Sequence, residues 1–163
     1  MPETLDAHDL ALLRRSLRVA EASRGAGRHP FGSLVVAADG TVLAEAGNDS
    51  LPPDGDPTRH AELVAVATAF RAAGGPDGMV GSTLYTSAEP CAMCSGAAYW
   101  TGIDRVVYAL SEHRLLELTG DHPENPTFSL PCREVFARGQ RRILVSGPHL
   151  EDEAAAAHEG FWV

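Results

Sequence analysis

Two short motifs, each at the start of a helical pattern, constrain the fold of this chain more than any other feature. His60-Ala61-Glu62 opens the alanine-rich segment 60–75, whose apolar residues recur at helical spacing until a double glycine ends it. Pro90-Cys91-Ala92-Met93-Cys94 opens a second predicted helix, 91–100, with proline at a helix start, where it is tolerated. A predicted buried strand, 82–89, lies between them. If the motifs act together, the fold must place two helix starts side by side.

The residue types in these motifs are those of a catalytic metal site. Cys91 and Cys94 lie three residues apart on one helical turn, so both thiolates can point the same way. The helix N-terminus favours negative charge there and lowers the thiol pKa. His60 would supply a third ligand from the neighbouring helix. Three protein ligands leave a fourth position for water, which predicts one catalytic zinc ion per subunit rather than a closed structural site.

Glu62, two residues beyond the histidine, is the predicted catalytic residue. Zinc lowers the pKa of a bound water from about 16 to about 7. Glu62 can then take the water proton, protonate a ring nitrogen during attack, and finally protonate the departing amine. The order H-x-E…P-C-x-x-C is the sequence signature of zinc deaminases. Alone, the CxxC could be a redox pair or half of a structural zinc site, and the HxE a helix cap; together they favour catalytic zinc.

The rest of the chain predicts one domain, residues 1–163, of mixed α and β structure. We expect a first helix that ends near Gly25, and a hairpin of strands 31–38 and 41–47 around Asp39-Gly40. Strand 82–89, helix 91–100 and strand 105–110 predict parallel neighbours with a crossover helix. A last strand, 141–146, and a short terminal helix follow. The pattern of segment 111–131 predicts no element.

Charge and cysteine content narrow the function classes. The formal net charge is -9, and all 13 basic residues are arginine. A strongly acidic chain repels phosphate backbones, so a nucleic acid partner is not expected. No segment approaches the roughly 18 apolar residues of a membrane span. Two cysteines in a CxxC and a distant Cys132, expected to be a buried small residue, suggest no disulfide framework and fit a cytoplasmic protein.

Several segments resemble a known family. HPFGSLVV (29–36), DPTRHAE (56–62), TLYTSAEPCAMCSGAAYW (83–100) and RVVYAL (105–110) are similar to motifs of the cytidine and deoxycytidylate deaminase-like superfamily, within its branch of guanine deaminases and related base or nucleoside deaminases. The resemblance implies a three-layer α/β/α fold with a five-stranded mixed sheet and helices on both faces. It also implies a homodimer that hydrolyses the amino group of a small nucleobase or nucleoside, a guanine-like purine first among them, and releases ammonia.

The same resemblance implies six substrate-binding residues. Asn48 matches an asparagine that binds the base or ribose, although it could instead be a turn residue. Phe31 matches a residue that forms a pocket wall in the family. The backbone N–H of Ala61 matches one that contacts a carbonyl group of the base. Trp100, at the end of the predicted helix 91–100, resembles the residue at that place in guanine deaminases. Phe161 and Trp162 resemble an aromatic tail that closes over the substrate. Core packing is the alternative for these aromatic residues.

Segment 111–131 leaves the identity of the substrate open. Guanine deaminases carry an additional aspartate in the region of segment 111–131, where this chain has Asp121, His122 and Glu124 without a clear match. Guanosine, isoguanine, cytosine and triazine-like bases therefore remain open, with a cytosine deaminase as one alternative. The other is a tRNA-specific adenosine deaminase, which should carry a basic tail, whereas this chain ends in LEDEAAAAHEGFWV. A non-catalytic module would be expected to lose Glu62 or a ligand.

Overall fold

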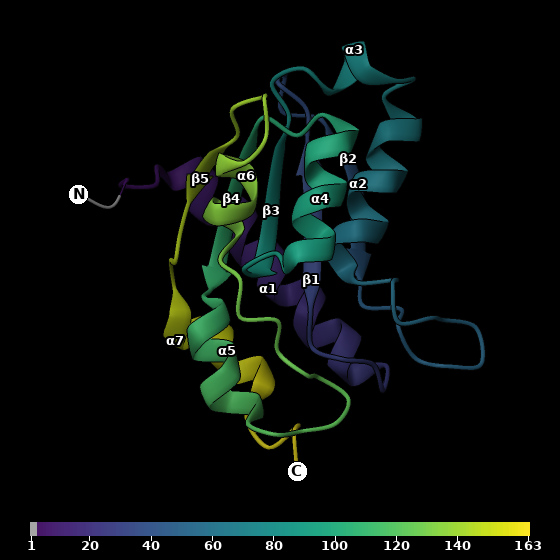
Figure 1. The fold of residues 1–163 in the computed structure, drawn as a ribbon, viewed down its shortest axis with the longest axis vertical. Helices are drawn as coiled ribbons and strands as arrows, with labels where there is room; N and C mark the ends of the chain where they lie inside the picture. Colours follow the sequence, from purple (N-terminus) through teal and green to yellow (C-terminus); the bar gives the residue numbers. More distant parts are fainter. Residues whose placement is uncertain (1–2) are drawn as a thin grey trace.

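The computed structural model describes residues 3–163, which are built around one five-stranded sheet (Figure 1). The strands lie in the order β2-β1-β3-β4-β5. β1 is antiparallel to both of its neighbours, whereas β3, β4 and β5 are parallel. Their bounds are β1 Gly32–Val36, β2 Val42–Gly47, β3 Thr83–Ala88, β4 Arg105–Leu110 and β5 Leu144–Ser146. The five-stranded mixed sheet expected from the family resemblance is confirmed.

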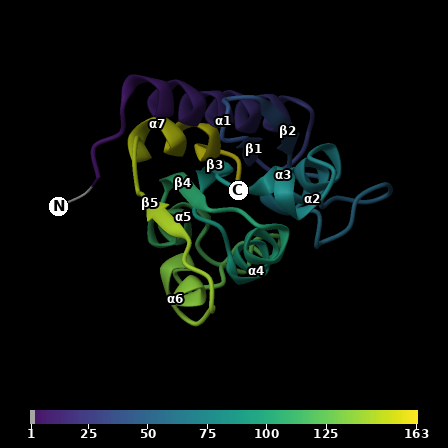
Figure 2. The same cartoon turned by 90° about the horizontal axis from the view of Figure 1, so that it is seen from above.

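Helices cover both faces of this sheet, as Figure 2 shows from above. α1 and α7 lie on one face, and α2, α4 and α6 lie on the other. The bounds are α1 Ala7–Gly25, α2 Ala61–Ala72, α3 Pro76–Met79, α4 Ala92–Thr101, α5 Glu112–Thr119, α6 Cys132–Ala137 and α7 Glu151–Ala155, followed by a 3-10 turn, Ala156–His158. The expected three-layer α/β/α arrangement is therefore confirmed.

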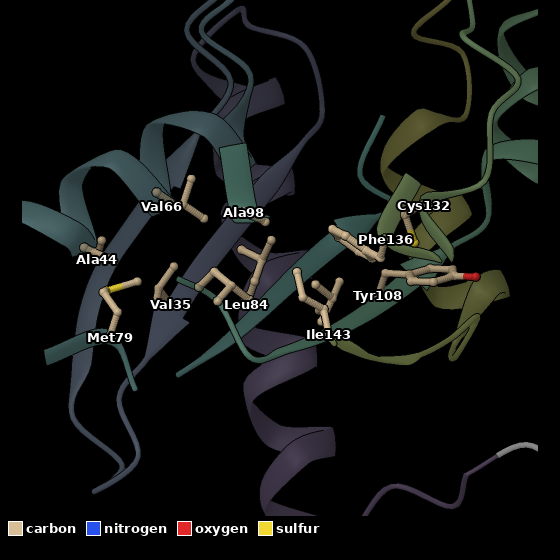
Figure 3. Close-up of a cluster of buried hydrophobic side chains, with 14 residues drawn as sticks. Val35, Ala44, Val66, Met79, Leu84, Ala98, Tyr108, Cys132, Phe136 and Ile143 are labelled. Atoms are coloured by element: carbon tan, nitrogen blue, oxygen red, sulfur yellow. The ribbon is translucent and has the colours of Figure 1, made fainter. Parts of the chain in front are cut away.

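The alternation of side chains along the strands explains the three layers. In β1, Leu34 packs with the helices on the α1 side, and Val35 packs with those on the α2 side. β4 repeats the pattern with Val107 and Val106. Figure 3 shows the core on the α2 side, where Met79, Phe136 and other side chains fill the space between the sheet and α2, α4 and α6. Because both faces of the sheet are covered, the central strands β1, β3 and β4 are buried at nearly every position, whereas the edge strands β2 and β5 are partly exposed.

Short elements account for the differences from the sequence prediction. The segment with no predicted element, 111–131, begins with α5, and α6 follows directly after it. The last strand covers Leu144–Ser146 rather than 141–146, and the short α3 was not predicted. Helices of four to eight residues lack enough hydrogen bonds to form alone, so tertiary packing stabilises them and periodicity does not reveal them. Within residues 3–163, the structure contains no helix long and apolar enough to cross a lipid bilayer.

One end of the sheet gathers the residues singled out by the sequence. The parallel strands β3 and β4 both finish there. The hairpin brings its first and last residues to the same end, because Gly32 pairs with Gly47. Asn48 follows directly, and its N–H donates to the carbonyl oxygen of Phe31 at 3.2 Å. In parallel sheets, ligands bind at the carboxyl ends of the strands, so this end is where a site is expected.

The close packing of α1 on β1 gives a first testable prediction. A Cβ added to Gly32 would lie 2.5 Å from the Ser16 carbonyl oxygen and 2.5 Å from the Ala20 nitrogen. We expect Gly32→Ala to lower the free energy of unfolding by about 1–3 kcal/mol, because the helix must move away from the strand. Gly25→Ala is the control, since nothing lies within 4 Å of its added Cβ. Urea unfolding midpoints measure both, and equal midpoints would contradict the packing described.

Candidate metal and substrate site

The starts of α2 and α4 form the centre of the site. His60 is the N-cap residue of α2, Cys91 is the N-cap residue of α4, and the two helices pack against each other. The His60 Nδ1 and Cys91 Sγ atoms are 3.7 Å apart. One ligand atom from each of His60, Cys91 and Cys94 lies within 4.8 Å of the other two. The structure therefore brings together the three residues that the sequence predicted as metal ligands.

The chemistry of this donor group fits zinc. The hydrogen bond from Cys94 and the nearby His60 hold the pKa of Cys91 at about 4, so this thiol is ready as a thiolate. The Cys91 thiolate in turn raises the pKa of Cys94, because the two sulfur atoms share one proton. It also raises the pKa of His60. One imidazole and two thiols are the soft N/S donors that zinc prefers, and three of them leave a fourth position for water.

A cavity of about 340 Å³ opens on this group. Glu62 lines it and is 5% exposed, and burial raises the pKa of its carboxyl to about 7. The other lining residues come from all the segments that end at this edge of the sheet: His29, Phe31, Asn48, Pro57, His60, Ala88, Glu89, Cys91, Met93, Glu112, Leu115, Asn125, Pro126, Thr127 and Phe128. The cavity is within the size range of small-molecule sites.

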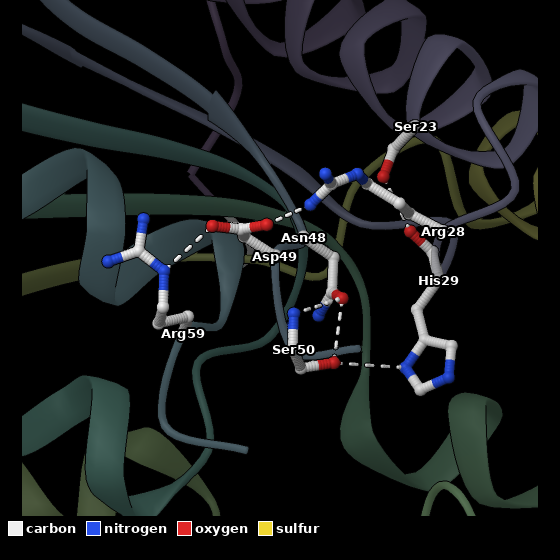
Figure 4. Close-up of polar contacts among 7 residues, drawn as sticks. All are labelled: Ser23, Arg28, His29, Asn48, Asp49, Ser50 and Arg59. Atoms are coloured by element: carbon white, nitrogen blue, oxygen red, sulfur yellow. Dashed lines mark hydrogen bonds and ion pairs between the residues drawn. The ribbon is translucent and has the colours of Figure 1, made fainter. Parts of the chain in front are cut away.

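Asn48 is a turn residue that also lines the cavity. Its side-chain oxygen accepts hydrogen bonds from the N–H of Ser50 at 3.0 Å and from the Ser50 hydroxyl at 2.7 Å, which is turn chemistry (Figure 4). Asp49, beside it, is held by ion pairs with Arg28 and Arg59. The Asn48 amide nitrogen keeps its hydrogens available, because no acceptor for it lies among the described residues. The turn thus fixes a donor in the cavity wall.

The other predicted substrate-binding residues differ in whether they line the cavity. Phe31 lines it. Ala61 is the first residue of α2, where a backbone N–H has no acceptor in its own helix. Phe161 and Trp162 are not among the lining residues, although the Trp162 ring lies 6.2 Å from that of Phe31. Trp100, at the end of α4, is 83% exposed and also outside the lining. Substrate contacts by these residues stay predictions.

The aromatic tail packs against the outside of the cavity wall of its own chain. The Trp162 ring lies 5.1 Å from the ring of His29, which lines the cavity, and 5.3 Å from that of His122. Its indole N–H donates to His158 at 3.1 Å, and burial lowers the pKa of His158 to about 4. Glu124 pairs with the same histidine, at 2.8 Å from His29 Nε2. His122 contacts the tail and Glu124 contacts the wall residue His29, and neither lines the cavity itself.

Sequence reasoning missed Glu112 and the stretch 125–128. Glu112 is 9% exposed and lines the cavity, whereas the side chain of its neighbour His113 is exposed. Burial raises the pKa of Glu112 to about 8. One sequence signal pointed to segment 111–131, because it directly follows β4, whose end lies at the site. Since this segment shows no periodicity, the signal did not show which of its residues faces the cavity.

Comparison with known proteins agrees with this geometry. The family model for the cytidine and deoxycytidylate deaminase zinc-binding region matches residues 6–110. A protein described as a probable cytosine deaminase from Schizosaccharomyces pombe is 42% identical over 158 residues, which is 97% of this chain and 94% of that one. The guanine deaminase of Bacillus subtilis is 43% identical over 84 residues, or 52% of this chain and 51% of its own.

Solved structures give the same picture over nearly the whole chain. The guanine deaminase from Nitrosomonas europaea superimposes with a TM-score of 0.77 and 28% sequence identity, over 99% of this chain and 87% of that chain. The similarity therefore includes the carboxyl-terminal part, beyond the residues that the family model matches.

The three cysteines allow a test of the metal group. We expect Cys91→Ala and Cys94→Ala each to weaken zinc binding by more than the roughly 10- to 100-fold that outer-shell changes cost, because a ligand atom is lost. Cys132→Ala is the matched control: its thiol is fully buried but lies outside the group. Zinc per chain, measured by mass spectrometry after dialysis, should fall only in the first two. Full zinc content in Cys91→Ala would refute the assignment.

Proposed function

The chain belongs to the cytidine and deoxycytidylate deaminase zinc-binding family, and from this premise we propose that it hydrolyses the amino group of a free nucleobase or nucleoside. The products are the corresponding oxo compound and ammonia. His60, Cys91 and Cys94 would hold zinc, and Glu62 would move the protons. Guanine-like purines and cytosine are the candidate substrates.

One observation carries this proposal: the ligand group and a buried carboxyl share one cavity. Glu62 lies on the first turn of α2, two residues from His60, so the helix that places the ligand also places the acid. A redox pair or a structural zinc site has no need for a buried acid at a cavity wall. The arrangement supports hydrolysis rather than either alternative.

The roles of the residues follow from their positions. Zinc bound by the three ligands supplies Lewis acidity that makes water nucleophilic near neutral pH. Glu62 would accept one proton of the attacking water and deliver it to the ring nitrogen. It would then take the second proton, from the hydroxyl group added to the ring carbon, and deliver it to the departing amine. The Asn48 amide donates a hydrogen bond to an oxygen or ring nitrogen of the base and so orients it. Phe31, beside Asn48, contributes an apolar wall for the ring.

The charge of the cavity favours a substrate without phosphate. Among residues 3–163, neither lysine nor arginine lines the cavity, whereas Glu62, Glu89 and Glu112 do. Without a lysine or arginine in the described lining, a phosphate group finds no cationic side chain to pair with, and the whole chain carries a net charge of -9. This supports a small base or nucleoside over an anticodon stem. The homodimer expected for the family belongs to the same proposal, and light scattering can measure it.

Two observations keep both candidate bases in the proposal. The relative from Schizosaccharomyces pombe, matched over 97% of this chain, carries the description of a probable cytosine deaminase. The structure similar over 99% of the chain is a guanine deaminase. Both bases are planar amino-oxo heterocycles, and both present an acceptor to Asn48.

Ammonia release by the zinc-loaded protein tests the proposal. The panel contains guanine, guanosine, cytosine, adenine, isoguanine, a triazine and an anticodon stem-loop RNA. We expect turnover of a free base or nucleoside. Activity on the RNA alone would instead identify a tRNA deaminase and contradict the charge argument, and no activity on any member would overturn the proposal.

Glu62 gives a sharper prediction. Glu62→Ala should keep one zinc per chain, because the three ligands remain, yet lower kcat by at least about 100-fold through loss of proton transfer. Zinc analysis and steady-state ammonia release measure the two effects separately. Glu45→Ala, an exposed acid on β2, is the control and should retain both properties. Undiminished turnover in Glu62→Ala would remove the proton-shuttle role.

A further inference from the structure

Glu112 is a buried acid that the proposed reaction does not yet use. It is the first residue of α5, directly after β4, and its side chain lines the cavity. The residue is 9% exposed. Its carboxyl group has no hydrogen-bond partner among residues 3–163. Among residues 3–163, Ser82 Oγ is the only fully buried side-chain nitrogen or oxygen without a partner, so the Glu112 oxygens reach the open space of the cavity, where a ligand can meet them.

Two other buried acids, which lie outside the proposed proton-transfer step, are paired. Asp9 accepts from the Tyr85 hydroxyl at 2.6 Å and from the Arg105 guanidinium at 2.8 Å. Glu89 accepts from the backbone N–H of Glu112 at 3.0 Å and from that of Cys132 at 2.9 Å. Pairing is therefore how this protein accommodates a buried carboxyl outside the reaction centre. Glu112 is an exception, and it faces a cavity.

The backbone that carries Glu112 is held in place from two sides. Glu89 binds its N–H, and Glu151 binds the N–H of the preceding Ser111 at 3.0 Å. The Ser111 hydroxyl donates to the same Glu151 oxygen at 2.7 Å. A backbone fixed in this way limits where the Glu112 side chain can reach, so less ordering is left to be done when a ligand binds. Burial and the neighbouring Cys91 and Glu89 raise the pKa of Glu112, which agrees with an unpaired carboxyl in a poorly solvated wall.

We propose that Glu112 is a substrate-binding residue whose carboxyl oxygen accepts a hydrogen bond from a ring N–H or amino group of the heterocycle in the cavity. This inference rests on the proposed function. Asn48 offers a donor and Glu112 an acceptor, so the pair selects a heterocycle that carries both an acceptor and an N–H donor. Amino-oxo bases have this pattern, and a carboxyl oxygen accepts such a bond whether the group is ionised or neutral. Glu89 is the positioning residue that holds Glu112.

Binding to a protein that cannot turn over its ligand tests the inference. In the Glu62→Ala background, we would measure calorimetric affinity for guanine and for cytosine, with and without Glu112→Ala. Loss of a hydrogen bond to a carboxyl should weaken binding of the preferred base roughly 10- to 100-fold. Glu117→Ala in the same background is the control, because Glu117 is an exposed acid on the same helix, paired with Arg114 at the surface. Glu112→Gln keeps an acceptor oxygen and should retain part of the affinity.

The melting temperature separates this role from a structural one. Removing an unpaired buried carboxyl should leave the melting temperature of Glu112→Ala unchanged or higher, while the affinity falls. A lower melting temperature together with weaker binding would show a structural role and overturn the inference. Unchanged affinity would overturn it as well, as would a Glu62→Ala parent that binds neither base. Ammonia release by the unsubstituted protein decides the proposed function separately.

Discussion

The meeting of two helix starts at one end of the sheet is the constraint on which the rest of the site depends. His60 and Cys91 cap α2 and α4, and the packing of these helices brings three ligand atoms within 4.8 Å of one another. Each helix begins where a strand or its following loop ends, so the order of the strands in the sheet fixes the distance between the motifs. A family match over residues 6–110 covers the elements that make this arrangement. The metal group is therefore a property of the topology, and the cavity is the space that the topology leaves beside it.

Three walls from different segments of the chain enclose the cavity, and their residues decide which ligands the cavity can bind. One wall comes from the hairpin, with Phe31 and the donor of Asn48, and another comes from α2 with Glu62. The third comes from the segment after β4, which brings Glu112 and the stretch 125–128. The aromatic tail and Glu124 support this enclosure from outside through His29. Under the proposed function, a neutral heterocycle that forms hydrogen bonds suits such walls, since the described lining offers no lysine or arginine to a phosphate group.

Sequence reasoning predicted the parts of this structure that rest on strong local patterns. The hairpin at Asp39-Gly40, the two motif-bearing helices and the parallel crossover between β3 and β4 all follow from turn chemistry and periodicity. The short helices α5 and α6 could not be predicted, because packing against α7 and α4 stabilises them rather than their own sequence. The role of Glu112 was hidden for the same reason. Only the start of α5 determines that Glu112, rather than its neighbour His113, faces the cavity.

A zinc titration of the metal-stripped protein tests the central claim most directly. Ammonia release from guanine and cytosine would be followed together with bound zinc as the metal is added back. We expect no ammonia release without zinc, a rate of release that rises in proportion to bound zinc, and saturation at one zinc per chain. Release that is independent of zinc, or full zinc binding with no release from either base, would contradict the assignment of this cavity as a zinc-dependent base deaminase site.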